Sequence, residues 1–280
     1  MHKNADLDAL ASAYYLSRIF GGADLAADSL DRFSKYMVKK FGINVKFDAD
    51  ENSYDEIIVV DTASREQLGK FRDFRIDAVY DHHASNDILA DVRVVKPSYP
   101  SCSEMLYDIF GKVENEIAYV LLMGGIITDT RWFRHANGGT FRIVSRLIED
   151  SGIEYGKIAE IFDFPYVQSE KVAILKGMQR LKFRTKGRKI VAYTIVGAHE
   201  SSVATLLSSI ADAIFVASAR GDEVRITGRS REINLLEVYH DVSVAFGCKY
   251  GGHKNAAGMT CIGDPEAVLN ALAIECEKRL

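Results

Sequence analysis

The sequence predicts an α/β fold in two parts, a doubly wound domain with a parallel sheet followed by a smaller α/β domain. In the first half, short apolar runs rich in β-branched residues alternate with helix-like stretches, which is typical of buried parallel strands joined by helices. In the second half of the 280-residue chain, a new group of strand-like runs follows a helical stretch. We therefore expect two domains, with a boundary between residues 165 and 185.

The first half begins with a predicted helix at residues 7–20, where apolar side chains on nearly every face indicate burial. The runs EIIVVD, IDAVYD and VRVVKP predict three buried parallel strands at residues 56–61, 76–81 and 92–97. Two further helices are expected at residues 101–110 and 116–123.

A helical stretch at residues 166–184 leads into the second half. Three strands are expected there, KIVAYTIVGA (189–198), DAIFVASA (212–219) and EVRITGRS (223–230). A GGHKNAAG loop and a helix from Pro265 close the chain. The expected organisation is a first domain at residues 1–165, a linker helix at 166–185 and a second domain at 186–280.

Composition excludes several classes of protein. A hydrophobic content of 48% with 26% charged residues is ordinary for a soluble globular chain, and the net charge of −4 argues against a surface coated with phosphate-binding cations. The longest apolar runs fall short of the roughly 20 residues that span a bilayer, so we expect a cytoplasmic protein without a membrane partner. The cysteines have neither zinc-site spacing nor the density of a disulfide scaffold, which predicts reduced thiols at Cys102, Cys248, Cys261 and Cys276.

Acids and histidines gather where the predicted strands end. Asp61 and Asp81 end two apolar runs, and Asp129 follows the GGIIT segment. A single Asp at such a position usually caps the next helix, but capping does not explain the adjacent His82 and His83. It also does not explain the HKNADLD segment at the start, which combines His2, Asp6 and Asp8. Oxygen and imidazole ligands without thiolates suit hard or borderline divalent ions, so the sequence predicts manganese, magnesium or cobalt rather than structural zinc.

These segments together resemble a known family. H-x-N-x-D-x-D near the start, D-T after an apolar run, D-H-H and I-T-D-T are similar, in order and context, to the four motifs of the DHH phosphoesterases. GRS and GGHKNAAG in the second half resemble the two signatures of the DHH-associated domain. The resemblance covers nearly the whole chain, and several motifs in the correct order are far more specific than a lone D-H-H.

The resemblance implies a centre of two divalent metal ions, most readily manganese. Asp61 would bridge both ions and take part in catalysis, and His83 would face the substrate phosphate as a second catalytic residue. The resemblance assigns one ion to His2, Asp6 and Asp61, and the other to Asp8, Asp61, His82 and Asp129. The second domain would bind substrate through Arg229, Gly251, Gly252 and His253, with the active site in the cleft between the domains.

The function implied is a manganese-dependent phosphodiesterase or phosphatase that acts on short oligonucleotides or a small phosphorylated nucleotide, similar to the oligoribonuclease and 3′-phosphoadenosine 5′-phosphate phosphatase branch. An inorganic pyrophosphatase or exopolyphosphatase is the first alternative, because the metal motifs are shared, although that branch has a different second domain. A nucleotide-sensing module with lapsed catalysis is the second alternative, and the intact ligand set counts against it. The sequence leaves open whether the chain forms a homodimer.

The sequence departs from the family pattern in two places, before the first motif and just before the last one. Family members usually carry an apolar strand before the first motif, whereas Met1 directly precedes His2 here. Either the chain starts upstream of Met1, or other contacts hold a shortened metal loop. Tyr250 stands where a further glycine is common and would narrow the substrate pocket.

Two other segments are weaker candidates for substrate contacts. Residues 179–190 carry six cations that would form a basic ridge if extended, although a solvated strand face or linker end is the favoured explanation. The residues after Asp129, from Arg131 to His135, would line the cleft, and Trp132 is a candidate to stack on a base. Core packing is the more usual role for an aromatic residue at such a place.

Overall fold

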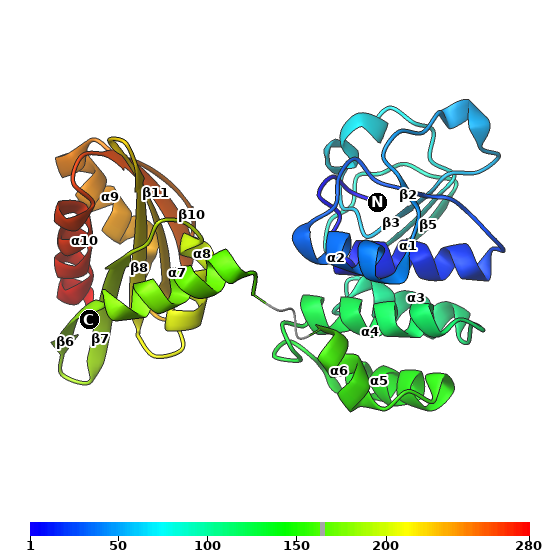
Figure 1. The fold of residues 1–280 in the computed structure, drawn as a ribbon. Helices are drawn as coiled ribbons and strands as arrows, with labels where there is room; N and C mark the ends of the chain where they lie inside the picture. Colours follow the sequence, from blue (N-terminus) through cyan, green and yellow to red (C-terminus); the bar gives the residue numbers. More distant parts are fainter. Residues whose placement is uncertain (163–165) are drawn as a thin grey trace. The chain divides into compact units, whose positions relative to one another are not determined.

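The computed structural model describes residues 1–162 and 166–280 and divides the chain into two compact units, Met1–Phe164 (unit 1) and Pro165–Leu280 (unit 2) (Figure 1). Unit 1 contains parallel strands and helices, and unit 2 contains a second sheet with its own helices, so the predicted α/β class is confirmed. Within the described residues, every helix is too short or too polar to cross a membrane.

The strands of unit 1 form two separate parallel groups. One is a three-stranded sheet in the order β3-β4-β5, in which Val59 lies beside Val79 and Val79 beside Arg93. The other is the pair β1-β2. The strand bounds are β1 Leu25–Ala26, β2 Val45–Lys46, β3 Ile58–Val60, β4 Ala78–Asp81 and β5 Val92–Val95.

The core of unit 1 lies around helix α1, which packs against α3 and α4 (Figure 1). Asp6 caps α1 by accepting hydrogen bonds from the amides of Asp8 and Ala9, and the alanine- and leucine-rich helix is buried along most of its length. The helices of unit 1 are α1 Leu7–Ile19, α2 Arg32–Phe41, α3 Cys102–Phe110, α4 Glu116–Asp129, α5 Gly138–Ser151 and α6 Tyr155–Phe162, with short 3₁₀ turns at Glu51–Ser53 and Arg65–Phe71.

Two expectations for unit 1 were wrong. The third predicted strand is not buried: β5 lies at an edge of the sheet, and its residues Val92 and Arg93 are exposed. The helix expected to end at residue 123 continues through Gly124 and Gly125 to its last residue at 129. These glycines permit close packing: a Cβ on Gly125 would lie only 2.6 Å from the Asp8 carboxylate.

The N-terminal loop is held by contacts from two other segments, residues 26–29 and the 3₁₀ turn at Arg65–Phe71. The Met1 amino group donates to the carbonyl of Ala26 at 3.2 Å, and the amide of Lys3 donates to the carbonyl of Gln67 at 2.5 Å. The amide of Ala5 donates to the carbonyl of Ser29 at 2.9 Å. A cavity of about 530 Å³ lies beside Met1, between the free edges of β1 and β3. Backbone hydrogen bonds therefore hold the loop at Met1, Lys3 and Ala5. The β1-β2 pair and the β3-β4-β5 sheet are not hydrogen-bonded to each other.

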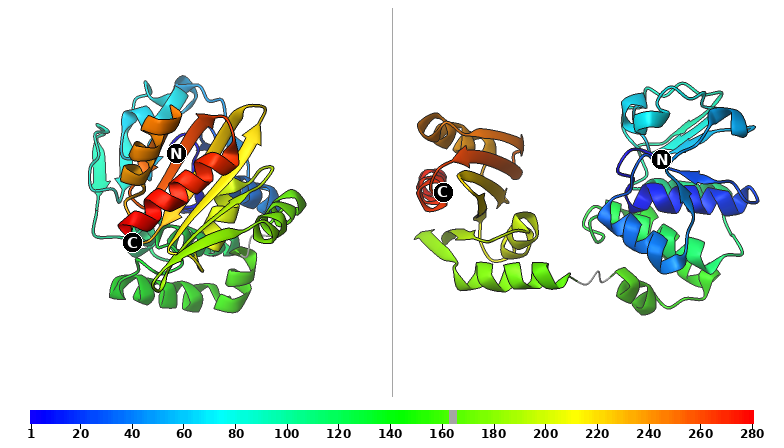
Figure 2. Two further views of the ribbon diagram at one scale, coloured as in Figure 1. Left: turned by 90° about the vertical axis from the view of Figure 1, so that its left-hand side faces the viewer. Right: turned by 45° about the horizontal axis from the view of Figure 1, so that its top comes forward.

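Unit 2 is built on a six-stranded mixed sheet in the order β10-β11-β9-β8-β7-β6, in which only β7 and β8 are parallel. Helices α9 and α10 pack on one face (Figure 2), and α7 and α8 pack on the other. The strands are β6 Lys182–Lys186, β7 Lys189–Ile195, β8 Ala213–Arg220, β9 Glu223–Ser230, β10 Lys249–His253 and β11 Ala256–Ile262. The helices are α7 Gln168–Gln179, α8 Glu200–Leu207, α9 Leu235–Phe246 and α10 Pro265–Arg279.

Two boundaries in unit 2 differ from the expected ones. The predicted linker helix ends early, because α7 stops at Gln179 and residues 182–186 form β6, which returns to β7 through a turn at Gly187 with φ +61°. The predicted GGHKNAAG loop is largely strand: β10 and β11 form an antiparallel hairpin in which His253 pairs with Ala256. In both places, the alternation of short strands was hidden by lysine, arginine and glycine, which are poor strand signals in sequence.

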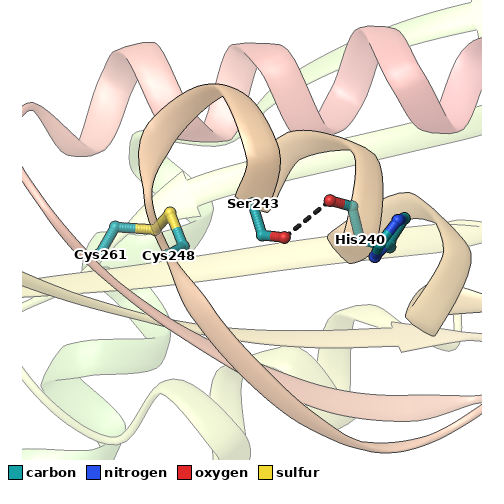
Figure 3. Close-up of a disulfide and its surroundings, with 4 residues drawn as sticks. All are labelled: His240, Ser243, Cys248 and Cys261. Atoms are coloured by element: carbon teal, nitrogen blue, oxygen red, sulfur yellow. Dashed lines mark hydrogen bonds between the residues drawn. A yellow bond between two sulfur atoms is a disulfide. The ribbon is translucent and has the colours of Figure 1, made fainter.

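The cysteines also differ from the expectation of reduced thiols throughout. Cys248 and Cys261 form a disulfide that joins the start of β10 to β11 (Figure 3). Lys249 pairs with Thr260 in the hairpin, so the two cysteines extend the same register by one step. Cys102 and Cys276 are free and buried. The separation of thirteen residues between the two cysteines does not by itself predict a disulfide. The β10-β11 hairpin brings the two cysteines next to each other.

Candidate metal centre and substrate-binding face

The first part of the candidate metal centre is the loop that enters α1. His2 lies on this loop with its Nε2 atom 3.7 Å from Asp6 Oδ1. Asp8 lies in the first turn of α1 and is completely buried. Its two carboxylate oxygens accept hydrogen bonds from the amides of Cys102 at 2.6 Å and Ser103 at 2.9 Å, at the N-terminus of α3. These amides hold Asp8 in place, since a helix N-terminus favours a negative charge.

Asp61 lies directly after β3, at the carboxyl end of the parallel sheet. Its backbone has φ +49°, a left-handed conformation that is uncommon for a residue with a side chain and costs about 1–3 kcal/mol. The amide of Asp61 donates to the carbonyl of Tyr80 at 2.9 Å, which holds this conformation. Its Oδ1 atom is buried and has no hydrogen-bond partner among the described residues. A strained, buried carboxylate with a free oxygen is typical of a ligand-binding position.

His82 follows β4 and lies among three carboxylates. Its Nε2 atom is 3.3 Å from Asp61 Oδ1, 3.3 Å from Asp129 Oδ2 and 3.9 Å from Asp8 Oδ2. The other ring nitrogen, Nδ1, lies 3.1 Å from the carbonyl of Tyr99, which fixes the orientation of the ring as in metal-binding histidines. Burial by itself would lower the pKa of His82, but the adjacent carboxylates of Asp129 and Asp61 raise it to about 11. The surroundings of this ring therefore strongly favour a positive charge.

The geometry brings all six predicted metal ligands together. Two atoms that each lie about 2.1 Å from one ion are separated by roughly 3 to 4.2 Å, and the distances from His2 and His82 to the nearby carboxylates fall in or close to this range. Asp61 presents Oδ2 to His2 at 4.0 Å and Oδ1 to His82 at 3.3 Å. Three groups of side chains have ligand atoms within 4.8 Å of one another, namely His2-Asp6-Asp61, Asp8-His82-Asp129 and Asp61-His82-His83.

The charges of this cluster also fit divalent cations. Burial, followed by the charges of Asp129 and Asp61, raises the pKa of Asp8 well above its usual value. The pKa of Asp129 is raised as well, chiefly by burial. Crowded, desolvated acids of this kind are stabilised by a bound cation, which supplies positive charge without a proton. The donor set of carboxylates and imidazoles without thiolates suits manganese or magnesium. The individual ligand roles stay predictions.

Asp129 reaches this cluster from an unexpected element. It was expected to follow a strand-like run, but it is the last residue of α4. The helix can bring it close because Gly125, one turn earlier, lies against Asp8 without a side chain between them. Apolar runs of this length do not distinguish a buried helix from a buried strand, which explains the wrong assignment.

His83 has two alternative partners, and one of them is much closer. Its Nδ1 atom lies 2.7 Å from Asp81 Oδ1 and 3.9 Å from Asp61 Oδ1. The contact with Asp81 therefore engages the nitrogen that would otherwise approach the Asp61 side of the cluster. The His83 side chain is 43% exposed, compared with 13% for His82. This difference favours the expected role of His83 at the substrate rather than as a metal ligand.

In unit 2, the structure places Arg229 and His253 in one row of the sheet. Ala256 of β11 pairs with Arg229 of β9 on one side and with His253 of β10 on the other. Residues paired across neighbouring strands point to the same face, so the two side chains share a face with one strand between them. Arg229 donates to the hydroxyl of Ser201 at 3.2 Å and to the carbonyl of Gly228 at 3.1 Å. We call Arg229, Ala256 and His253 the Arg229–His253 row.

The glycines beside this row differ in what they permit. Gly251 lies on the same face as His253, and an added Cβ would meet nothing within 4 Å, so a ligand has room to approach. Gly252 has φ +129°, and an added Cβ would lie 2.7 Å from the backbone of both Ala256 and Ala257. A side chain at position 252 would therefore clash with the neighbouring backbone, so this position requires glycine. The hydroxyl of Tyr250 lies 3.0 Å from the Nδ1 atom of His240.

The two weaker candidate segments behave differently from each other. The basic stretch is partly neutralised, because Lys182 pairs with Glu266 at 2.8 Å and Arg184 with Glu277 at 2.5 Å. This agrees with an ordinary strand face. Trp132 does not pack in the core: it is 56% exposed, and it lies in the run Arg131–Phe133, whose three residues all have positive φ. An exposed tryptophan in a strained turn directly after Asp129 remains a candidate for substrate contact.

The groups that orient the ligands leave little trace in the sequence. The amides of Cys102 and Ser103 carry no sequence signal, because every residue has an amide. Ser101, which caps α3, is the only visible sign that a helix N-terminus lies there. Asn86 was also missed, although it follows the D-H-H motif closely and donates to Asp81 at 2.8 Å.

Comparison with known proteins identifies the family. The N-terminal domain of the DHH family matches residues 1–125, and the DHHA1 domain matches residues 187–276. An uncharacterized protein of Methanocaldococcus jannaschii, MJ0988, is 30% identical over 305 residues, which cover 99% of this chain and 92% of that protein. The chain therefore belongs to the DHH phosphoesterase superfamily and is a phosphoesterase-like hydrolase.

Two solved structures show the same fold. An exopolyphosphatase-related protein from Bacteroides fragilis has a TM-score of 0.70 and 16% identity, covering 99% of this chain and 90% of that one. A candidate family II inorganic pyrophosphatase from Methanococcus jannaschii has a TM-score of 0.52 and 18% identity, covering 98% and 97% of the two chains. At these identities the likeness concerns the fold and not the substrate.

Proposed function

We propose that the protein is a manganese-dependent phosphodiesterase or phosphatase that hydrolyses short oligonucleotides or small phosphorylated nucleotides. The observation that carries the proposal is the convergence of six carboxylate and imidazole side chains around Asp61 in unit 1. Divalent ions held there would lower the pKa of a bound water and offset the negative charge of the phosphate.

The residues of unit 1 have separate roles in this proposal. Asp61 presents its two oxygens to the two sides of the cluster, and Asp8 is fixed by the amides of α3. His82 is oriented by the carbonyl of Tyr99 and faces the carboxylates with Nε2. His83 stands beside the cluster, more exposed, and as the imidazolium it would donate from Nε2 to a phosphate oxygen while Nδ1 donates to Asp81. No nucleophilic serine or cysteine is required.

Unit 2 would supply substrate recognition. The guanidinium of Arg229 can bind a phosphate with two hydrogen bonds, and His253 can bind a phosphate or sugar oxygen in the same row. Gly251 leaves room for a ligand beside them. A substrate with more than one phosphate, or with a phosphate and a sugar, would use such a row. This favours a nucleotide substrate over pyrophosphate, which offers nothing but phosphate oxygens.

A single panel of substrates tests the proposal. Purified protein is incubated with manganese and with 2- to 5-mer oligonucleotides, cyclic dinucleotides, 3′-phosphoadenosine 5′-phosphate, polyphosphate and pyrophosphate, and kcat/KM is measured for each. We expect the highest values for a short oligonucleotide or for the bisphosphorylated nucleotide, and none after metal removal by chelation. A control reaction restores activity to the chelated protein with manganese or magnesium, each alone.

The outcomes are distinct. If pyrophosphate or polyphosphate has the highest kcat/KM, the pyrophosphatase or exopolyphosphatase alternative replaces the nucleotide proposal. If every substrate binds but none is hydrolysed with any divalent ion, the chain is a nucleotide-sensing module.

A further inference from the structure

Asp81 is the buried acid of the D-H-H segment that the metal centre does not use. It is the last residue of β4, and its side chain is completely buried. It belongs to none of the three groups that could hold a metal ion. A buried carboxylate without a cation or hydrogen bonds would be costly, so its partners must account for its presence. Its two oxygens have two different partners.

One oxygen of Asp81 orients His83. Asp81 Oδ1 lies 2.7 Å from His83 Nδ1, which is a short hydrogen-bond distance. His83 Nε2 has no hydrogen-bond partner among the described residues. The contact therefore fixes the ring through one nitrogen and leaves the other for a ligand. The same arrangement orients the histidines of many hydrolytic sites.

The other oxygen of Asp81 is held by Asn86. The side-chain amide of Asn86 donates to Asp81 Oδ2 at 2.8 Å and also to the carbonyl of Thr62 at 2.8 Å. Thr62 directly follows Asp61, so Asn86 connects the segment after β3 to the segment after β4. Both amide hydrogens are used, which fixes the orientation of the Asn86 side chain.

Asn86 is itself held from two sides. Its Oδ1 atom accepts a hydrogen bond from the amide of Ile88 at 3.0 Å and another from the guanidinium of Arg93 at 3.3 Å. Arg93 lies on β5, the edge strand of the sheet, and also donates to the Asn86 carbonyl at 3.0 Å. A continuous chain of hydrogen bonds thus runs from Arg93 through Asn86 and Asp81 to His83.

We propose that Asn86 and Asp81 are positioning residues: they hold the His83 ring so that Nε2 meets the substrate phosphate, in register with Asp61. The inference rests on the proposed hydrolysis of phosphoesters, and it deepens that function by assigning the support of its substrate-facing histidine. A displacement of about 1 Å at a reacting centre can cost roughly 100-fold in rate, so loss of this support should be visible in turnover.

The test is a double-mutant cycle on phosphoester hydrolysis. Asn86→Ala, His83→Ala and the double variant are assayed with the best substrate of the panel and with bis-p-nitrophenyl phosphate. We expect Asn86→Ala to lower kcat/KM by about tenfold or more, and to cause little further loss once His83 is absent. Manganese affinity should stay within about twofold of the parental value, because Asn86 touches no predicted metal ligand. Asp81→Asn should show the same non-additivity.

A matched control separates positioning from general loss of stability. Asn115→Ala removes the cap of α4, whose Oδ1 accepts from the amide of Ala118 at 2.9 Å, and should destabilise unit 1 by a similar amount. At the assay temperature it should leave kcat/KM nearly unchanged. If Asn86→Ala has parental activity, if its loss persists in the His83→Ala background, or if manganese affinity falls in parallel with activity, the positioning role is wrong.

A spectroscopic measurement keeps the inference testable if no substrate is turned over. In protein labelled with ¹⁵N-histidine and held at a pH where the ring is neutral, His83 should show a single tautomer with its proton on Nδ1, toward Asp81; the signal is identified by its disappearance in His83→Ala. In Asn86→Ala, the His83 ring should instead show a mixture of its two neutral tautomers. An identical tautomer in both proteins would overturn the inference, whereas absence of hydrolysis alone would overturn only the proposed function.

Discussion

The metal centre of unit 1 and the Arg229–His253 row of unit 2 differ in what surrounds their charged groups. Asp8 and Asp61 are almost fully buried and lie close to further acids, whereas His253 is exposed and Arg229 is half-buried. The metal centre is therefore a set of like charges that the fold holds together against repulsion. The row in unit 2 places a half-buried and an exposed side chain on one face of the sheet, with one strand between them, at little cost. The first arrangement depends on bound cations, and the second depends on a substrate.

The largest expected effect comes from Asp61, which belongs to two of the candidate metal groups and presents one oxygen to His2 and the other to His82. Asp61→Asn keeps the shape of the side chain but removes its charge, so kcat/KM should fall by about 10³-fold and exceed the loss in His83→Ala. Manganese stoichiometry, measured on the dialysed protein, should fall as well. Asp55→Asn, an exposed position before β3, is the matched control and should change neither quantity. Full manganese occupancy with near-normal turnover in Asp61→Asn would contradict the two-metal assignment.

Substitutions in the Arg229–His253 row should lower kcat/KM for the substrate and leave metal binding unchanged. Arg229→Ala and His253→Ala should each lower kcat/KM for dinucleotides by roughly ten- to several hundred-fold, because a charge-assisted contact to phosphate is lost. The small ester bis-p-nitrophenyl phosphate should be affected much less. Arg225→Ala, on the same strand and paired with Glu223 at the surface, is the control. Parental cleavage of dinucleotides by both variants would remove unit 2 from recognition.

Metal binding should release protons, because the raised pKa of His82, about 11, means that its ring carries a proton at neutral pH without metal. A metal ligand must be neutral imidazole, so this proton leaves when an ion binds. Manganese affinity should therefore rise by about tenfold per pH unit between pH 6 and 8 for each proton released. Calorimetry in buffers of different ionisation enthalpy measures the number of protons released when manganese binds. An affinity independent of pH would show that His82 is not a ligand.

The smallest expected effect concerns Trp132, the single tryptophan of the chain. Stacking on a base is worth about 1–3 kcal/mol, so Trp132→Ala should weaken binding of a dinucleotide by about fivefold or more. Nucleotides should quench the intrinsic fluorescence of the parental protein, while pyrophosphate should not. Equal quenching by both, or none by either, would place Trp132 outside the substrate site and leave recognition to the Arg229–His253 row.

Much of unit 1 could be predicted because its signals are local. The β-branched runs that end at Asp61 and Asp81 gave the strands β3 and β4, and the residues at their carboxyl ends had to lie at one edge of a parallel sheet. The order of the motifs indicated the family. The exposure of β5 was not predictable, since its three valines match a buried strand and only the folded structure shows which parts of the strand remain uncovered.

The structure of unit 2 was harder to predict from the sequence, because its features depend on which strands pair with each other. Residues 182–186 read as the end of a helix until β7 supplies hydrogen-bond partners, and the disulfide between Cys248 and Cys261 follows from the register of a hairpin built on glycines. Arg229 and His253 were assigned by motif alone. Only the ladder through Ala256 shows that they share a face.

By itself, the sequence determined which residue types are available and in what order: His2, Asp6 and Asp8 before a buried helix, Asp61 after one strand, and His82 and His83 after the next. The tertiary structure decided which atom of each faces which partner. Asp61 Oδ1 is buried beside His82 Nε2 on a residue with a left-handed backbone, and His83 turns its Nδ1 atom to Asp81, whose other oxygen is held by Asn86. Such assignments depend on contacts between segments far apart in the chain, and those contacts exist only after the sheet and the helices have packed.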